Sequence, residues 1–238
     1  MRLVSEWARL RHAIVADGAL AGVLIHDGVD VVRPASDTPH AVRDPLFVVA
    51  GHTIEGSLRL NVRRSEGAVL RAVLAAEARV AAVPPGSDNE VDGPFLEGGD
   101  VIVTPDEVYV GMSGNASDLG GIDWLAASLG AERRVVPIAM RSSVLHLEDV
   151  LALVRPGLLV QCRPLLVDGL PRALRDWQSI DIATEERADL LVLNDRRALV
   201  AASQPRLAAA LSAHGVDVVA TIALGVGLRS AHCALWRE

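Results

Sequence analysis

The segment Phe95-Leu96-Glu97-Gly98-Gly99-Asp100 contains the residues of this chain best suited to chemistry. Two carboxylates flank a pair of glycines, which lack a Cβ atom and therefore allow backbone angles and close approaches that other residues prevent. Taken alone, such a motif is more often a turn than a site. We interpret Glu97 and Asp100 as part of a candidate site for a cation, because two other reactive residues follow at wide intervals.

These residues are His146, in His146-Leu147-Glu148, and Cys233, in His232-Cys233-Ala234. A carboxylate, an imidazole and a thiol are the parts of a nucleophilic hydrolase. Only the thiolate attacks, so a nucleophilic cysteine needs a lowered pKa or a nearby base. If His146 and Glu148 lie on an extended segment, their side chains point to the same face. We therefore expect an acid/base and a carboxylate in one pocket.

Each of these residues also has a structural interpretation. Cysteine is among the most buried residue types, so Cys233 could simply belong to the core. Cys162 competes for the role of nucleophile but is more typical of a structural strand end. His232 would face the opposite side of its strand from Cys233, which makes it the weaker candidate for a base. Asp44, in Arg43-Asp44-Pro45, is by itself more typical of a turn.

A guanidinium or amidinium ligand would bring these parts together. Several carboxylates in one pocket repel each other, and a cation removes that repulsion. A guanidinium is planar, carries many donors and pairs with carboxylates through two hydrogen bonds. The same binding polarises its central carbon for attack by a thiolate.

Composition narrows the class of protein. The chain has 238 residues and a formal net charge of −7, which argues against nucleic-acid binding. Apolar stretches are shorter than a membrane span, and the first residues lack the apolar core of a signal peptide, so we expect a cytoplasmic protein. Two cysteines without Cys-x-x-Cys spacing are poor zinc ligands, and we expect neither metal nor cofactor. Many short apolar strands are compatible with a homo-oligomer.

The pattern along the chain predicts one mixed α/β domain over residues 1–238. Helical spacing or helix stop signals are found at Ser65–Ala78, Asp118–Gly130 and Pro205–His214. Strands are predicted at Leu10–Val15, Gly22–His26, Leu46–Ala50, 80–83, Val101–Val103, Val108–Gly111, Arg134–Ile138, Val216–Ala220 and Cys233–Trp236. Three further buried runs could be extended or helical: His146–Val154, Leu158–Gln161 and Leu190–Leu193.

With these motifs in order, the chain resembles the guanidino-group modifying enzymes, which include dimethylarginine dimethylaminohydrolase, arginine deiminase and the amidinotransferases. The resemblance rests on Ser5-Glu6-Trp7-Ala8-Arg9-Leu10, Arg43-Asp44-Pro45, Leu96-Glu97-Gly98-Gly99-Asp100-Val101, His146-Leu147-Glu148 and His232-Cys233. It implies a pentein fold, with five ββαβ-type units around a pseudo-fivefold axis and the site at the centre.

The resemblance also implies roles for individual residues. Cys233 would attack the guanidinium carbon and form a covalent thiouronium intermediate. His146 would protonate the leaving amine and then activate water, while Glu97 would bind a substrate nitrogen and orient His146. Asp44 would hold the guanidinium, with Glu148 as a second carboxylate. Asp100 is a further candidate for substrate binding.

Two departures from the family pattern leave the substrate open. Dimethylarginine hydrolases often have a lysine where this chain has Glu148, and the stretch after Val110-Gly111 lacks the arginine that grips a substrate carboxylate. Arg63, Arg64 or Arg229 could take over that grip, and we count Arg63 among the candidate substrate-binding residues. The leading hypothesis is a hydrolase of arginine or methylated arginine. An amidinotransferase and a non-catalytic guanidinium-binding protein are the alternatives.

Overall fold

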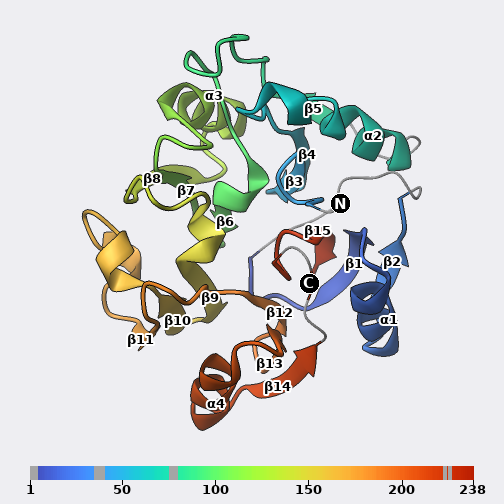
Figure 1. Cartoon of the computed structure of the whole chain (residues 1–238), viewed down its shortest axis with the longest axis vertical. Helices are drawn as coiled ribbons and strands as arrows, with labels where there is room; N and C mark the ends of the chain where they lie inside the picture. The colour runs from blue at the N-terminus through green and yellow to red at the C-terminus, as the bar shows by residue number, and fades with distance from the viewer. Residues whose placement is uncertain (1–4, 35–40, 75–79, 222–223, 225–226) are drawn as a thin grey trace.

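The strands of this protein form five small sheets with the same internal order. The computed structural model describes residues 5–34, 41–74, 80–221, 224 and 227–238. Within these residues each sheet has three strands, and its middle strand pairs antiparallel on one side and parallel on the other. In Figure 1 the sheets follow one another in chain order around the view. The mixed α/β class predicted from the sequence is confirmed.

The first sheet joins the two ends of the described chain. Strand β15 (His232–Arg237) pairs antiparallel with β1 (Leu10–Val15), and β2 (Asp30–Val32) pairs parallel with the other edge of β1. Helix α1 (Gly18–His26) connects β1 to β2. Cys233 therefore lies on a strand held in place by the N-terminal part of the protein, opposite Ile14.

The other four sheets are each built from consecutive strands. They are β3–β5 (Leu46–Val49, His52–Glu55, Val80–Ala82), β6–β8 (Val101–Val103, Glu107–Met112, Arg134–Ala139), β9–β11 (Leu151–Arg155, Leu158–Gln161, Gln178–Asp181) and β12–β14 (Leu190–Asn194, Arg197–Ala201, Asp217–Thr221). A helix precedes the third strand in three of them: α2 (Glu66–Val73), α3 (Leu119–Leu129) and α4 (Pro205–Ala213). In β9–β11 two short 3-10 turns, Arg163–Leu165 and Arg172–Leu174, occupy that place.

One predicted strand is wrong. The apolar run Gly22–His26 lies in α1, because Asp17 caps a helix that begins earlier and accepts a hydrogen bond from the Leu20 amide at 2.8 Å. The helix is apolar on most sides, so its pattern does not distinguish it from a buried strand. The strands predicted at Val101–Val103 and Val108–Gly111 are confirmed and pair as a hairpin, and the helices near 118–130 and 205–214 are also confirmed. The end of the helix predicted at Ser65–Ala78 lies outside the described residues.

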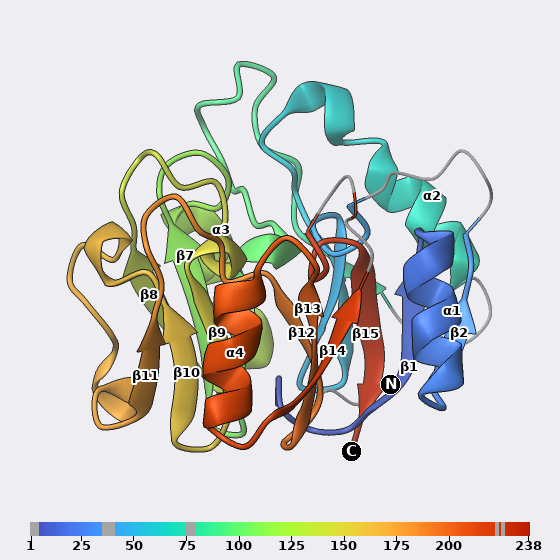
Figure 2. The ribbon, with the colours of Figure 1, turned by 60° about the horizontal axis from the view of Figure 1, so that its bottom comes forward.

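Buried apolar side chains form two clusters between the sheets and their helices. One contains residues of β1, β15, β3 and β6, and the other is centred on β9, β10 and β12. In Figure 2 the strands stand side by side with α1 and α4 on the outer surface. No helix in the described part of the chain is both long and apolar enough to cross a membrane.

Candidate active site

The Gly98-Gly99 pair lets three segments meet. The amide of Gly98 donates to the Asp44 carbonyl oxygen at 2.9 Å, and a short 3-10 turn covers Gly98–Asp100. A Cβ atom at Gly98 would clash with the Arg43 carbonyl oxygen, and one at Gly99 would lie 2.8 Å from both Asp44 Oδ1 and His146 Cγ. Only glycine permits this approach, so the turn brings Glu97, Asp44 and His146 together.

These three side chains form a buried cluster. His146 Nε2 lies 2.9 Å from Glu97 Oε2, and His146 Nδ1 lies 3.8 Å from Asp44 Oδ1. Asp44, Glu97 and His146 are 2%, 3% and 4% exposed. Glu97 is fixed further, since its Oε1 accepts a hydrogen bond from the Arg59 amide at 3.0 Å. The predicted convergence of an acid, a second acid and an imidazole is therefore present in the structure.

The carboxylates keep the imidazole charged. Burial on its own would lower the pKa of His146, but Asp44, Glu97 and Asp100 outweigh it and raise this pKa to about 10. For Asp44, burial and the nearby Glu97 raise the pKa, while His146 and Arg63 oppose the shift. At neutral pH the cluster therefore presents an imidazolium ready to donate a proton.

One oxygen in the cluster has no hydrogen-bond donor. Asp44 Oδ2 accepts from Arg63 Nη2 at 3.0 Å, while Asp44 Oδ1 is buried and unpartnered among the described residues. Buried carboxylate oxygens are normally satisfied, and an orphan is costly. The ligand atoms of Asp44, Glu97 and His146 lie within 4.8 Å of one another, so a cation bound at Asp44 would also lie close to Glu97. A metal ion could be ligated by all three residues only with the imidazole deprotonated, whereas a guanidinium group would bind the carboxylates through its own N–H groups.

Asp100 connects the residues around the cluster through hydrogen bonds to backbone amides. Its two carboxylate oxygens accept hydrogen bonds from the Ser117 amide at 3.0 Å and from the Leu147 amide at 2.9 Å. Burial raises the pKa of Asp100 to about 7, against the lowering effects of His146 and Ser117. The carboxylate ties the Gly98-Gly99 turn to the segment that carries His146. Both oxygens of Asp100 thus accept hydrogen bonds from backbone amides, and its contact with a substrate stays a prediction.

His146 and Glu148 do not lie on an extended segment, the condition under which their side chains would share a face. A 3-10 turn covers Leu147–Asp149 instead. His146 faces Glu97, whereas Glu148 accepts a short hydrogen bond from the Ser230 hydroxyl and lies 3.5 Å from Arg43 Nε. Glu148 therefore belongs to a second buried group of charges.

That second group is centred on Arg43. Its guanidinium donates to the carbonyl oxygens of Gly98 (3.1 Å) and Val101 (2.7 Å) and to Glu6 Oε1 (3.0 Å). Glu6 also lies 3.5 Å from Arg229 Nη2. Burial would raise the pKa of Glu6, but the arginines lower it to about 2. Sequence analysis assigned no role to Arg43 or Glu6, although both stand in motifs that carry the family resemblance.

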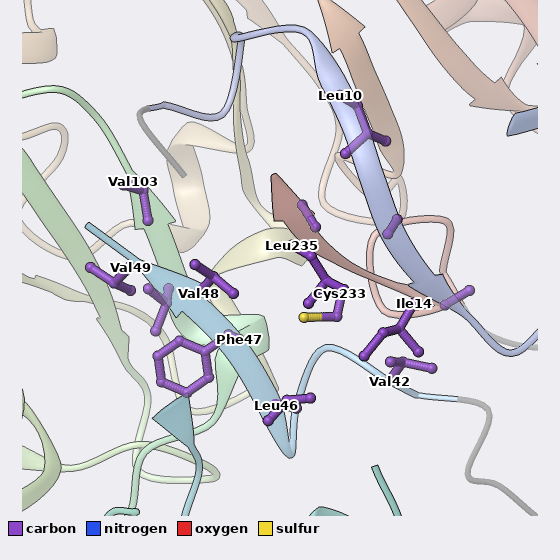
Figure 3. Close-up of a cluster of buried hydrophobic side chains, with 14 of the residues drawn as sticks. Leu10, Ile14, Val42, Leu46, Phe47, Val48, Val49, Val103, Cys233 and Leu235 are labelled. Atoms are coloured by element: carbon purple, nitrogen blue, oxygen red, sulfur yellow. The ribbon is translucent and has the colours of Figure 1, made fainter. Parts of the chain in front are cut away.

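Cys233 lies beside Arg43 in apolar surroundings. Figure 3 shows its thiol among Ile14, Leu46 and Phe47, and the side chain is 1% exposed. Burial raises the pKa of Cys233 to about 12, although Arg43 opposes the shift. The thiol lines a cavity of about 10 Å³, which is room for about one water molecule.

Different residues surround the thiol and the imidazole. Gly98 packs against Arg43 and Phe47, which line the cavity of Cys233, while Gly99 packs against Asp44 and His146. Within the described residues the thiol makes no hydrogen bond to His146. The structure thus brings Asp44, Glu97 and His146 together and leaves Cys233 in the adjacent cavity.

The arginines expected to grip a substrate carboxylate already have partners. Arg63 donates to Asp44 and to both oxygens of Glu66, at 2.9–3.0 Å. Arg64 donates to four backbone carbonyl oxygens, including Leu58 O and Gly86 O. Arg229 donates to Leu151 O at 3.0 Å. In this structure the guanidinium of Arg63 donates to Asp44, the carboxylate that is expected to hold the guanidinium of a substrate.

Comparison with known proteins gives the family. No family model matches the chain. Its sequence is 33% identical over 196 residues to N(G),N(G)-dimethylarginine dimethylaminohydrolase of Streptomyces coelicolor, covering 79% of this chain and 69% of that enzyme. It is 27% identical over 212 residues to inosamine-phosphate amidinotransferase 1 of Streptomyces glaucescens, covering 74% of this chain. The chain spans about 60% of the length of its amidinotransferase relatives.

Solved structures show the same fold. SxtG, an amidinotransferase of the saxitoxin biosynthetic pathway from Microseira wollei, superposes with a TM-score of 0.84 at 18% identity, over 100% of this chain and 97% of that one. Dimethylarginine dimethylaminohydrolase from Pseudomonas aeruginosa superposes with a TM-score of 0.76 at 19% identity, over 94% and 99%. The chain belongs to the guanidino-group modifying enzymes. Its relatives are enzymes that act on guanidino groups.

Proposed function

We propose that this protein hydrolyses a guanidino compound, with arginine or an N-methylated arginine as the leading substrate and citrulline plus ammonia or an amine as products. The observation that carries the proposal is the buried, unpartnered Asp44 Oδ1 beside a charged His146. A planar guanidinium bound at Asp44 would donate the missing hydrogen bond and neutralise the carboxylates. His146 would then lie next to the leaving nitrogen of the guanidinium, which must accept a proton when its bond to carbon breaks.

The reaction would take place in two halves. In the first, the Cys233 thiol loses its proton to solvent when the substrate binds, and Sγ then forms a bond to the guanidinium carbon while His146 gives its proton to the leaving nitrogen and that C–N bond breaks. In the second, His146 takes a proton from water and the hydroxide attacks the same carbon. The C–S bond then breaks and the hydroxyl proton passes to the departing sulfur, which leaves a neutral ureido group and the free thiol. Glu97 holds His146 in place during both transfers through its hydrogen bond to Nε2.

Cys233 must be activated by the substrate in this proposal. Its pKa of about 12 keeps the free protein in the thiol form at neutral pH, and a cation bound nearby is the change that lowers a thiol pKa. Because the cavity beside the thiol has room for about one water molecule, substrate binding would also shift Arg43 and Phe47, which line it and against which Gly98 packs. The proposed mechanism therefore includes a local rearrangement around Gly98.

The decisive experiment measures citrulline release from arginine and from methylarginines. Cys233→Ser should reduce the rate by about three orders of magnitude or more, because it removes the nucleophile. Cys162→Ser is the matched control, since Cys162 is also buried and free but lies against Ala183 on another sheet. Undiminished citrulline formation by Cys233→Ser would contradict the mechanism.

An amidinotransferase is the second candidate. The likeness to amidinotransferases in sequence and in fold favours it. In that reaction an acceptor amine would replace water in the second half and carry away the amidino group. Incubation with arginine labelled at the guanidinium carbon and a set of amines distinguishes the two, because the label would appear in a new guanidino compound and not in citrulline.

A guanidinium-binding protein without turnover is the third candidate. The small cavity at Cys233 and the raised pKa of its thiol favour this reading. Such a protein would bind arginine in a titration and release no citrulline. It would also show no selective reaction of Cys233 with a cationic alkylating agent.

We also propose that residues 1–238 form one pentein domain in which the five units are related by a pseudo-fivefold axis. The shared order of an antiparallel and a parallel neighbour around each middle strand supports this arrangement. A single cooperative unfolding transition, observed by both circular dichroism and tryptophan fluorescence, is expected for one domain.

A further inference from the structure

The guanidinium of Arg63 lies on the carboxylate to which the proposed function assigns a substrate. Its Nη2 donates to Asp44 Oδ2 at 3.0 Å, beside the Asp44 Oδ1 that has no donor among the described residues. Arg63 therefore carries the same functional group that the site is proposed to bind. Because two guanidinium ions on one carboxylate repel each other, Arg63 and a substrate compete for Asp44.

Arg63 has a second partner, which remains when the bond to Asp44 is lost. Its Nε and Nη2 donate to the two carboxylate oxygens of Glu66, at 3.0 Å and 2.9 Å, and a paired contact of this kind is a strong one between arginine and a carboxylate. Glu66 lies in the first turn of α2, three residues after Arg63. A guanidinium displaced from Asp44 thus stays paired with a carboxylate.

The backbone around Arg63 is held in place, so the displacement needs only a rotation of the side chain. The amide of Arg59 donates to Glu97 Oε1 at 3.0 Å, and the guanidinium of Arg64 donates to four backbone carbonyl oxygens. The segment on both sides of Arg63 is therefore tied to its surroundings while the Arg63 side chain is free to change partners.

Arg63 is also the most accessible of the charged groups at the cluster. Its side chain is 22% exposed, whereas those of Asp44, Glu97 and His146 are 4–5% exposed. A ligand that approaches Asp44 from solvent on this side meets the guanidinium of Arg63 before it reaches the carboxylate.

We propose that Arg63 is an internal competitor of the substrate, which occupies Asp44 in the free protein and is displaced onto Glu66 alone when a substrate guanidinium binds. The proposal rests on the proposed function, because it takes Asp44 as the carboxylate that binds the substrate. Occupation of a site in the free protein weakens the apparent affinity of a ligand, by the fraction of molecules in which the site is open. The competition selects ligands that bind Asp44 through more than the single hydrogen bond of Arg63.

A purely supporting role for Arg63 predicts the opposite effect. Burial and Glu97 raise the pKa of Asp44, while His146 and Arg63 oppose the rise. If Arg63 served only to keep Asp44 ionised, its removal would weaken the binding of a cation. Competition predicts tighter binding, so the sign of the change distinguishes the two roles.

The test measures the binding of methylguanidinium to the full chain by calorimetric titration. This probe has no carboxylate, so a contact of Arg63 with the far end of a substrate does not enter the measurement. Arg63→Gln should bind the probe at least roughly tenfold more tightly than the wild type, as expected if Asp44 is open in about a tenth of wild-type molecules. Binding by Arg63→Gln that is equal to or weaker than that of the wild type would overturn the proposal.

A second variant tests the role of Glu66. Glu66→Gln should weaken binding of the probe to the wild type, because it removes the carboxylate that receives the displaced Arg63. The same substitution should have little effect in the Arg63→Gln background, since Glu66 acts through Arg63. An equal loss in both backgrounds would show a general effect of charge and contradict the competition.

Controls separate this proposal from the proposed function. Arg71→Gln removes one positive charge from α2, but Arg71 pairs with Glu55, so this variant should bind the probe like the wild type. Circular dichroism establishes that each variant is folded. A gain in Arg71→Gln as large as that in Arg63→Gln would overturn the competition alone. Binding that survives Asp44→Asn, or no binding by any variant, would contradict Asp44 as the guanidinium site and the proposed function with it.

Discussion

His146 Nε2 lies 2.9 Å from Glu97 Oε2, and neither side chain is more than 4% exposed. In a buried setting such a charge-assisted hydrogen bond fixes both the orientation of the ring and its charge. The imidazole can therefore act as an acid over a wide pH range, provided that the carboxylates around it stay ionised.

Replacing Glu97 by Gln should lower the pKa of His146. The substitution removes a negative charge and replaces the carboxylate that accepts the Nε2 hydrogen by a neutral, weaker amide acceptor, and both changes disfavour the protonated ring. A two-dimensional NMR titration of the ring should show its midpoint fall from about 10 toward the ordinary histidine range. The alkaline limb of the pH–rate profile should move in the same direction. Glu132→Gln, next to the exposed His52, is the control. An unchanged His146 midpoint would show that Glu97 does not set its charge.

Replacing Glu6 by Gln should destabilise the fold in a pH-dependent way. The pKa of Glu6 is lowered from 4.5 to about 2, so its contribution is complete above pH 4.5 and is lost as pH falls toward 2. Breaking a buried ion pair of this kind costs about 3–5 kcal/mol at neutral pH. Denaturant unfolding at pH 7, 4 and 3 should show that the difference in the free energy of unfolding between the variant and the wild type becomes smaller as the pH falls. Glu238→Gln, at an exposed pair with Arg11, should have a small and nearly constant effect.

Replacing Gly98 by Ala should disrupt the turn that joins the two buried charge groups. Its Cβ would clash with a backbone oxygen, that of Arg43, which cannot rotate away as a side chain can. We expect a loss of about 1–3 kcal/mol in the free energy of unfolding, together with loss of activity. Gly22→Ala in α1 is the matched control, because nothing lies within 4 Å of its Cβ and alanine favours a helix. If Gly98→Ala were as stable and active as the wild type, the turn would tolerate a greater distance between residue 98 and the Arg43 carbonyl oxygen than the structure shows.

Cys233 should react faster with a cationic alkylating agent than with a neutral one. Chloroacetamidine carries an amidinium that can bind at Asp44 and lower the pKa of the thiol, whereas chloroacetamide has nearly the same shape and no charge. At pH 7 the ratio of the two rates should be roughly tenfold or more at Cys233 and near one at Cys162, measured by peptide mass spectrometry. Burial raises the pKa of Cys162 as well, which makes it a suitable internal standard. Equal rates at Cys233 would remove the support for substrate-assisted activation.

Much of the fold and part of the site could be predicted from local sequence. The strands on either side of Thr104-Pro105-Asp106 were predicted correctly. The ordered motifs predicted one site formed by Asp44, Glu97, His146 and Cys233, and the structure brings the first three together. The residues after His146 form a 3-10 turn, which the alternation of apolar and polar residues does not distinguish from an extended segment. The surroundings of Cys233 depend on Arg43 and Phe47, which reach it from a distant segment, and no local pattern encodes such packing.

The pairing of β15 with β1 has a consequence for synthesis of the chain. The strand that carries Cys233 follows the strands of the four other sheets along the chain, whereas its partner at Leu10–Val15 precedes them all. The edge of β1 therefore stays open while the four other sheets are completed, and closing it requires contacts across nearly the whole sequence. A nascent chain released early would keep an exposed strand edge and lack its thiol, so a truncated product would be both inactive and prone to associate.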